Sequence, residues 1–478
     1  MIEISRKQIQ SVRSTLRQAV GRTSSRRTPF VTFQATSDVW TIRASNETVA
    51  IECRVPGSYQ PACFAIPIEA LAACEGRQDD AVQFDQTADL VTLRWFDANI
   101  PQSAQFATSE PISMPELPAT FAAIDRQFMY AMADACDTTD SDSTRYALDC
   151  VRLRGADGQI AATDGQQALI QSGFQFPWTE EVLVPAAAVF GAKSVRESRD
   201  VTIGRSTDWM FVRAGEWTIA LKIEKDRRFP AIDTQVPDVS AAASTMVLAE
   251  DDADFLVRAA NRLPGSEDAN APVTLDLNGA VVVRAKSAEQ QSPTDLVLRN
   301  SRRRGEELKV SSNRDFLKRA IRLGFREIHF RDVDAPAFCR TDRRAYVWAL
   351  LGKDAVLKPD ATAVRIESPT VGRTTQQTRS QALPPQTAPS ASIPPTRNRI
   401  SMTTSQFERT SSTPTESGRT DTKTLTALIE DGESLRVTLR DVLAKTNALV
   451  VGLKRQRQQS NLMRAALKSL RAVQAIES

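Results

Sequence analysis

The stretch CFAIPIEAL at residues 63–71 decides how the chain is organised, because similar stretches recur twice further on. The counterparts are VLVPAAAVF at residues 182–190 and LKVSSNRDFL at residues 308–317. Each has a strand-like apolar part beside a short helical part, and each leads into further strand-like segments. A fixed period of this kind determines the architecture of a chain. The first 351 residues are therefore predicted to be one α+β unit written three times.

The three predicted units span residues 1–116, 117–240 and 241–358. Each is expected to hold two short helices and several strands. In the opening helix of the first unit, Ile9, Val12, Leu16 and Ala19 recur at helical spacing and predict a core face. A helix at about 121–135 is expected to open the second unit. Because the first turn of a helix tolerates proline, Pro67 and Pro185 are expected to open the second helices of the first two units.

Basic side chains line the predicted helices in stripes. Residues at i, i+4, i+7, i+8 and i+11 lie near one face of a helix. The set predicted to contact DNA is Arg6, Arg13, Arg17, Lys193, Arg196, Arg314, Lys318 and Arg322. Such stripes bind the phosphate backbone without reading sequence, and their affinity falls steeply with salt. A basic helix face is also compatible with a surface that is merely solvated.

Composition excludes several classes of protein. Hydrophobic residues make up 41% of the 478, which is enough for a packed core over most of the length. Residues 1–365 carry 45 Lys/Arg against 49 Asp/Glu, whereas residues 366–478 carry 16 against 9, so an acidic body precedes a basic tail. The six cysteines show no CxxC spacing and are expected to be buried thiols in a reducing cytoplasm. No apolar window is long enough for a membrane span, and no membrane partner is expected.

No catalytic motif is present, so the protein is not expected to be an enzyme, and neither a cofactor nor a metal is expected. The single histidine, His329, lies in a strand-like segment without a motif around it. Asp137, Asp140 and Asp142 alternate as in a cation loop, but the glycine and terminal glutamate of a calcium loop are missing, which favours a surface turn. No P-loop occurs. A purely structural coiled-coil protein would account for the tail but not for the three globular units.

Several motifs of the chain resemble those of one family. They are RYALDCVRL at 145–153, AATDGQ at 161–166, RFP at 228–230 with VP at 236–237, and AYVWALL at 345–351. Their sequence and order resemble the bacterial sliding clamp, the beta subunit of DNA polymerase III, over about residues 1–351. The chain is identified as a diverged member of that family with a C-terminal extension.

The resemblance implies a fold and a function. The expected fold is three clamp-type domains with helices lining a ring and strands outside, closed as a head-to-tail homodimer. The expected function is to encircle double-stranded DNA and tether DNA polymerase for processive replication. Short peptides of DNA polymerase and of clamp loader subunits would be the protein partners. The alternative is a diverged paralogue that acts as a repair or interaction scaffold without a replicative role.

The resemblance also implies a peptide pocket between the second and third domains. Carried over position by position, it would comprise Thr163, Gly165, Gln166, Gln167, Ala168, Pro230, Val347 and Ala349. The family has a basic pair and a leucine where this chain has Gln166, Gln167 and Ala168, and a Met-Pro-Met ending where it has Ala349-Leu350-Leu351. Either a smaller, less charged pocket binds a different peptide, or these are core strand residues that have lost the docking function.

The chain continues well past Leu351, where family members stop. Residues 367–420 are rich in Ser, Thr, Pro and Gln, which predicts a disordered linker. Residues 421–478 are predicted to form a helical, coiled-coil-like tail, because the positions at heptad spacing from Leu428 to Leu470 are apolar apart from Gln456. The last part of this tail is basic and is expected to recruit a partner or to hold additional DNA.

Overall fold

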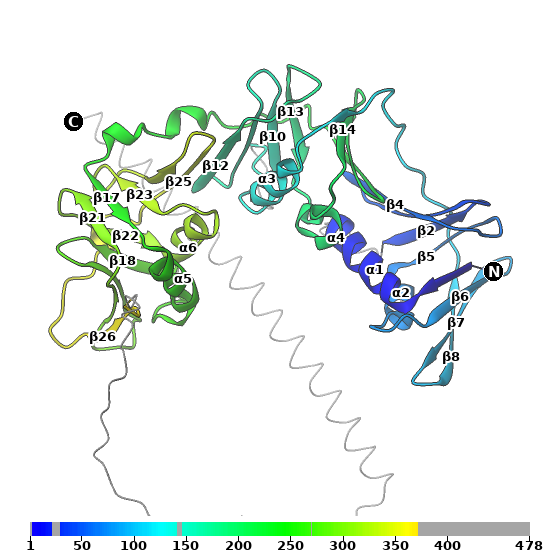
Figure 1. Ribbon diagram of the computed structural model, residues 1–478, viewed down its shortest axis with the longest axis horizontal. Coiled ribbons are helices and arrows are strands. Elements are labelled where there is room, and N and C mark those ends of the chain that lie inside the picture. The colour runs from blue at the N-terminus through cyan, green and yellow to red at the C-terminus, as the bar shows by residue number, and fades with distance from the viewer. Residues whose placement is uncertain (1, 22–28, 141–145, 269, 371–478) are drawn as a thin grey trace, which may run out of the picture. The chain divides into compact units, whose positions relative to one another are not determined.

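The structure of the protein is a computed structural model, and it describes residues 2–21, 29–140, 146–268 and 270–370 (Figure 1). The predicted coiled-coil tail at 421–478 lies outside the described residues, and so does the predicted linker from residue 371 onward. The described chain has a mixed α+β fold in which one order of elements, strand and helix followed by strands, helix and strands, occurs three times. The predicted bounds are kept here as names for the three units.

The first unit contains a long opening helix and a short second one. Its elements are β1 (Ile2–Ser5), α1 (Arg6–Val20), β2 (Phe30–Ala35), β3 (Val39–Ser45), β4 (Val49–Pro56), β5 (Ala62–Pro67), α2 (Ile68–Cys74), β6 (Ala81–Gln86), β7 (Leu90–Asp97) and β8 (Ile100–Ala107). A capping box between Ser5 and Gln8 starts α1. Pro67 is the residue before α2 and therefore precedes the first turn.

The second unit repeats this order with a shorter second helix. Its elements are β9 (Ala122–Ala123), α3 (Gln127–Cys136), β10 (Cys150–Arg154), β11 (Gln159–Thr163), β12 (Gln167–Ser172), β13 (Glu181–Pro185), η1 (Ala188–Gly191), α4 (Lys193–Arg196), β14 (Val201–Arg205), β15 (Trp209–Ala214) and β16 (Trp217–Lys222). The predicted start of the helix at 121 is wrong, because residues 122–123 pair with β14 as an edge strand. Pro185 ends β13, and a 3₁₀ turn separates it from α4.

The third unit begins after the linking turns η2 (Asp233–Gln235) and η3 (Val239–Ala241). Its elements are β17 (Ser244–Val247), α5 (Glu250–Ala259), η4 (Ala260–Arg262), β18 (Pro272–Asp276), β19 (Val281–Ala285), β20 (Thr294–Leu298), β21 (Arg302–Gly305), β22 (Lys309–Asn313), α6 (Arg314–Arg322), β23 (Glu327–Phe330), β24 (Ala337–Arg340), β25 (Arg344–Trp348) and η5 (Lys353–Ala355). Asn313 caps α6 through the backbone N–H of Asp315, as its position before the helix predicts.

The units are joined by sheets that cross the boundaries between them. Strand β4 of the first unit pairs antiparallel with β16 of the second, in the register Ile51 with Ile219. Strand β12 of the second unit pairs antiparallel with β25 of the third, in the register Leu169 with Tyr346. The first junction produces an eight-stranded sheet and the second a nine-stranded sheet. The neighbouring units are thus bonded through their backbones.

Apolar faces of the helices and sheets form the core. Ile9, Val12, Leu16 and Ala19 are all buried, so the predicted core face of α1 is confirmed. Side chains from the first two units share one apolar cluster, and most of the third unit forms another. Five of the six cysteines are buried as expected, whereas Cys63 is exposed because its side chain lies on the outer face of β5.

The ordered chain extends past the last strand of the third repeat. After Leu351 it forms η5 and then β26 (Val364–Glu367), which pairs parallel with β20. Residue Ser368 is 2% exposed. Residues 359–370, which follow the predicted end of the third unit, therefore pack on that unit, and the first residues of the predicted linker are part of the folded body.

Candidate nucleic-acid and partner interfaces

Two of the eight arginines and lysines predicted to contact DNA are buried arginines that bind the backbone of the protein itself. Arg6 is 9% exposed, and its guanidinium donates to the carbonyl oxygens of Cys74, Glu75 and Phe96 at 3.0 to 3.3 Å and to Asp97 Oδ1 at 3.0 Å. It fastens the start of α1 to the end of α2 and to the β7–β8 turn. The prediction of a DNA contact for Arg6 is corrected, because its donors are already used.

Arg314 is the second of these arginines and is 1% exposed. Its guanidinium donates to five carbonyl oxygens at 2.6 to 3.1 Å, which belong to Ala260, Leu263, Pro264, Ala271 and Pro272. Burial lowers the pKa of Arg314 relative to its ordinary value. The predicted DNA contact is corrected here too, since Arg314 joins α6 to the loop that follows α5.

Lys318 lies one turn further along α6 and is also removed from the DNA-contacting set. It is 8% exposed, and Nζ donates to Asn261 Oδ1 and to Asp315 Oδ1, each at 2.6 Å. Its charge is neutralised inside the third unit. The stripe of α6 thus presents only its last member, Arg322, which is exposed.

The remaining members of the predicted set differ in how far they reach into solvent. Arg17 and Lys193 are exposed, and Lys193 is 4.0 Å from Glu197. Arg13 is half-buried in an ion pair with Glu75, at 2.7 Å between Nη1 and Oε1. The guanidinium carbon of Arg196 lies over the ring of Tyr130, 5.3 Å from its centre. The exposed cations Arg17, Lys193 and Arg322 are therefore the members available to a ligand.

The structure adds exposed basic residues that the sequence analysis missed. They are Lys7 on α1, Arg126 before α3, Arg199 after α4, Arg258 on α5 and Arg262 on η4. A helical projection would have found Lys7 and Arg258, whereas the others lie at helix ends whose bounds the sequence does not fix. These residues enlarge the set of cations on or next to the helices.

The helices contact one another from unit to unit. Thr15 Oγ1 of α1 and Ser194 Oγ of α4 are 2.8 Å apart, which joins the first and second units. Arg319 of α6 donates to the carbonyl oxygen of Asp134, at the end of α3, and to Thr138 Oγ1, which joins the second and third units. Figure 1 shows α1 beside α2 and α5 beside α6 within their units. The exposed cations therefore belong to helices that form one connected layer.

The predicted peptide pocket begins at the turn between β11 and β12. Gly165 has φ +89°, a left-handed conformation that favours glycine, and the Asp164 carboxylate accepts the N–H groups of Gln166 and Gln167. The buried Thr163 hydroxyl donates to the carbonyl oxygen of Gln167 at 2.6 Å. These hydrogen bonds hold the turn, which brings the start of β12 against β25.

Most of the other predicted pocket residues pack into the protein. Ala168 and Val347 lie in an apolar cluster that also contains Phe229 and Ile232 of the segment linking the second and third units. Gln167 is 8% exposed, and its Oε1 accepts the hydroxyl of Tyr346 at 2.5 Å. Pro230 is half-buried, and Gln166 and Ala349 are exposed. The two junction strands therefore bring the predicted residues together, largely as a filled interface.

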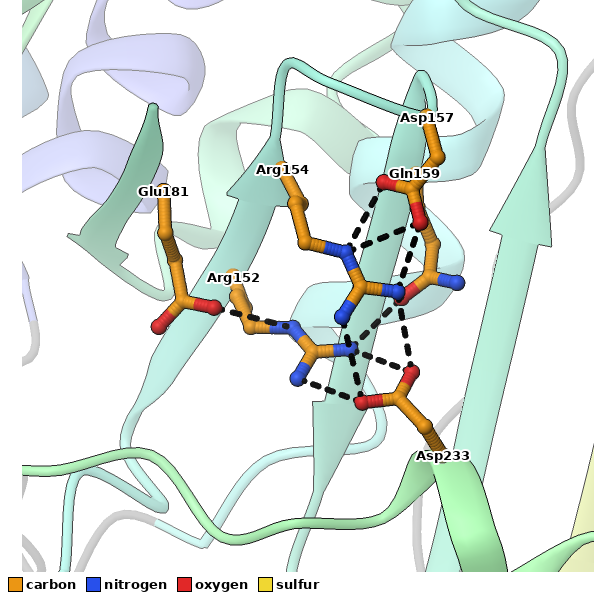
Figure 2. Close-up of polar contacts among 6 residues, drawn as sticks. All are labelled: Arg152, Arg154, Asp157, Gln159, Glu181 and Asp233. Atoms are coloured by element: carbon orange, nitrogen blue, oxygen red, sulfur yellow. Dashed lines mark hydrogen bonds and ion pairs between the residues drawn. The ribbon is translucent and has the colours of Figure 1, made fainter. Parts of the chain in front are cut away.

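An open cleft lies further along the same two strands. It has a volume of about 240 Å³, and its polar lining includes Arg154, Asp233, Arg340, Asp342 and Arg343. Figure 2 shows how the network at its edge is held. Asp233 of η2 accepts from Arg152 at 2.8 and 3.0 Å and from Arg154 at 3.3 Å. The cations thus fix the linking segment on the second unit.

In the network of Figure 2, the neighbouring arginines keep the carboxyl group of Asp233 ionised. Burial would raise the pKa of Asp233, but Arg152 and Arg154 outweigh burial and hold the pKa of this carboxyl below its ordinary value. Glu181 lies 3.9 Å from Arg152 Nε, and Asp157 accepts from Arg154 at 2.8 Å. Asp233 therefore stays ionised near neutral pH and keeps the link docked.

The structure was compared with known proteins. Neither a protein-family model nor a curated protein sequence matches the chain. Among solved structures, it is similar to the beta subunit of DNA polymerase III from Pseudomonas aeruginosa, with 17% identity and a TM-score of 0.59 over 74% of this chain and 100% of that one. The chain has the fold of a bacterial sliding clamp. Similar matches are the beta subunits from Thermotoga maritima (12%, TM-score 0.60, 74% and 99%) and Streptococcus pneumoniae (14%, 0.58, 73% and 99%).

Within the part of the chain that the structure describes, no group of three His, Cys, Asp or Glu side chains could hold a metal ion, and Asp142 of the acidic turn lies outside that part. In that same part, no helix is both long and apolar enough to cross a membrane. His329 is buried in β23 beside Thr245, and burial lowers its pKa.

Proposed function

We propose that the chain is a diverged sliding clamp that closes as a head-to-tail homodimer around double-stranded DNA in the cytoplasm. The observation that carries this proposal is the connected layer of helices with its exposed cations, in a chain with the clamp fold. Arg17, Lys193 and Arg322 would contact phosphates, with Lys7, Arg126, Arg199, Arg258 and Arg262 beside them. Contacts of this kind carry no sequence information, so the protein would slide.

The proposed mechanism is topological. A closed ring leaves DNA only at an end, so weak contacts are compatible with long retention. Tethering a polymerase to such a ring raises its effective concentration at the primer end without a new chemical step. The basic cleft on β12 and β25, together with the exposed pocket residues Gly165, Gln166 and Ala349, would receive short peptides of the polymerase and of the clamp loader. Arg340 and Arg343 of the cleft favour a peptide that carries acidic residues.

The test compares circular with linear DNA. The full chain is diluted until its protomers separate, mixed with nicked circular DNA and then concentrated above the dissociation constant of its homodimer, so that rings assemble around the circle. We expect retention on the circle at high salt and loss of the protein when a restriction enzyme linearises it. Equal binding to both forms would contradict encirclement. Retention without any stimulation of a polymerase would instead support the alternative, a clamp paralogue that serves as a repair or interaction scaffold.

Alanine variants test whether the exposed cations of the helices contribute to loading. Replacing Arg17, Lys193 and Arg322 together by Ala should lower loading onto the circle. The matched control replaces three exposed cations on strands, Arg54, Arg94 and Lys222, by Ala. If both triple variants lose loading to the same degree, overall charge and not the helix layer carries the interaction.

A further inference from the structure

The two junctions between units follow one rule of strand equivalence. Among the strands that repeat in each unit, the outermost strand of the first sheet is the third after the opening helix, which is β4, β12 or β20, and the outermost strand of the second sheet is the last, which is β8, β16 or β25. At the first junction β4 pairs with β16, and at the second β12 pairs with β25, both antiparallel. By the same rule, β20 of one chain would pair with β8 of a second copy.

Among the described residues, strand β8 is an unpaired edge strand without most of the features that usually prevent pairing with another chain. All eight of its residues, IPQSAQFA, are uncharged, and most of their side chains are exposed. Ile100 is 60% exposed, and Phe96 near the end of the neighbouring strand β7 is 56% exposed. Solitary edge strands are usually protected by charges, bulges or a cover. Only Pro101 interrupts the open edge of β8, so this edge is suited to accept another strand.

The β20 edge, in contrast, is already occupied by the chain itself. Strand β26 pairs with it over Thr294 to Val297, and the pairing is parallel, unlike both junctions. It comes from residues after the third repeat and has no counterpart among the described residues of the other two units. A strand in this place would keep a second chain about 4.8 Å away from the position that the repeat rule gives it. While β26 occupies the β20 edge, β20 cannot pair directly with β8 of a second copy.

The residues that cover β20, Val364 to Pro369, are here called the edge strap, and their anchor lies at the C-terminal end. Ser368 Oγ accepts the N–H of Arg299 at 2.9 Å, and Asn300 Nδ2 donates to the carbonyl oxygen of Pro369 at 2.9 Å. The buried carboxylate of Asp252 accepts from Asn300, and Ser368 also hydrogen-bonds to it. Ser368 is thus the deepest contact of the strap.

The rest of the edge strap is held by its backbone. Val364 and Ile366 are 59% and 43% exposed, and all four residues of β26 are exposed. Arg299 and Glu367 form an ion pair at 2.9 Å, with side chains 50% and 39% exposed, which contributes little. A short strand with few buried apolar contacts opens at a low free-energy cost. The strap can therefore leave β20 while the third unit stays folded.

We propose that the edge strap is an intramolecular cover that competes with a second copy of this chain for β20, so that the ring closes only when the strap is released. The inference rests on the proposed function, because the β20–β8 pair is the closure of the proposed homodimer. The strap runs directly into residue 371, so anything that binds the following segment is placed to pull on it.

The test changes one ladder donor in the full-length chain. The N–H groups of Val364 and Ser368 donate to Pro293 and Val297, so by alternation the N–H of Ile366 faces β20 and that of Arg365 faces away. Ile366→Pro removes an inward donor and should release the strap, whereas Arg365→Pro removes only an outward one. Sedimentation velocity over a concentration series measures self-association, and thermal unfolding checks that the body stays folded.

We expect the unmodified chain and Arg365→Pro to remain monomeric at concentrations where Ile366→Pro dimerises, with at least a tenfold difference in the dissociation constant. If Ile366→Pro does not fold, Ser368→Ala serves in its place, because it removes the deepest anchor without touching the ladder. Equal self-association of the unmodified chain and the strap variant, whether both dimerise or neither does, overturns the proposal.

A second variant identifies the edge that the released β20 binds. The N–H of Thr108 donates to Asp89, so by alternation the N–H of Ser103 on β8 points outward. Ser103→Pro added to the strap variant should return it to the monomer, and continued dimerisation would show another interface and overturn the β8 assignment. A strap variant that dimerises through β8 but is not retained on circular DNA would reject the clamp function while leaving the strap proposal intact.

Discussion

The carboxylate of Asp252 on α5 accepts a hydrogen bond from the hydroxyl of Ser301, with 2.7 Å between Oδ2 and Oγ. Asp252 is fully buried. Burial alone would raise the pKa of this carboxyl, but hydrogen bonds from Ser301, Ser368 and Asn300 outweigh burial and lower it below its ordinary value. The stability contributed by Asp252 is therefore present above the unfolded pKa and is lost as the pH falls through the lower folded pKa.

Replacing Asp252 by Asn tests this linkage. We expect the free energy of unfolding at pH 7 to fall by about 1–3 kcal/mol, because buried donors lose a charged acceptor. The difference from the unmodified chain should shrink as the pH falls below about 4. Urea denaturation across this pH range measures it. Asp254→Asn, an exposed change on the same helix, is the control, and a difference that does not change with pH would contradict the assignment.

Arg314 should matter to folding and not to DNA. Arg314→Met would leave the carbonyl oxygens of Leu263 and Pro264 without their side-chain donors in a buried place. We expect a loss of about 3–5 kcal/mol in the free energy of unfolding. The same change at exposed Arg322 should alter stability by less than about 0.5 kcal/mol. Chemical denaturation measures the free energy of unfolding of both variants. If the two variants are equally stable, the five hydrogen bonds of Arg314 do not stabilise the fold.

The salt dependence of DNA binding counts the phosphate contacts. For each contact removed, the slope of log K against log salt should become less steep by about 0.9. Fluorescence anisotropy with duplex DNA, using the Ala triple variant at Arg17, Lys193 and Arg322, measures the slope. An unchanged slope together with weaker binding would mean that these side chains act through structure and not through phosphates.

The hydroxyl of Tyr346 should stabilise the junction between the second and third units. Tyr346→Phe leaves the buried Gln167 Oε1 without its donor at the β12–β25 pair. The expected cost is about 1–2 kcal/mol in the free energy of unfolding, measured by urea denaturation. A matched control is Tyr146→Phe, at a residue that is 40% exposed. Equal effects of the two changes would show that the junction does not depend on this hydrogen bond.

Local periodicity was sufficient for the architecture but not for the direction of single side chains. The apolar spacing of α1 predicted that Ile9, Val12, Leu16 and Ala19 are core residues, because the helical period alone places these side chains on one face. Arg6 and Arg314 follow the caps Ser5 and Asn313, and on a helical projection they align with exposed cations. They turn inward because carbonyl groups of Phe96 and Leu263 lie above the helix start, and those loops are far away in sequence.

The strap could not be predicted for a similar physical reason. Residues 364–367 form a strand only because β20 offers an unpaired edge, and their own side chains are exposed. Val364 to Glu367 alternate between apolar and charged residues, but the alternation covers only four residues and does not show with which edge they pair. For the predicted peptide pocket, the resemblance located the two strands correctly. It could not show that Phe229 and Ile232 fill the space between the pocket residues, because that depends on tertiary packing.

The pairing of β4 with β16 has a consequence for how the protein is made. The ribosome releases β4 at residue 56, but its partner is complete only at residue 222. At a synthesis rate of about 5–20 residues per second, the nascent first unit waits roughly ten to thirty seconds with an open edge. During that interval it is a target for chaperones and for pairing with neighbouring nascent chains on a polysome. The sheet shared by the first two units can therefore be completed only after residue 222 has been synthesised, so the two units mature together.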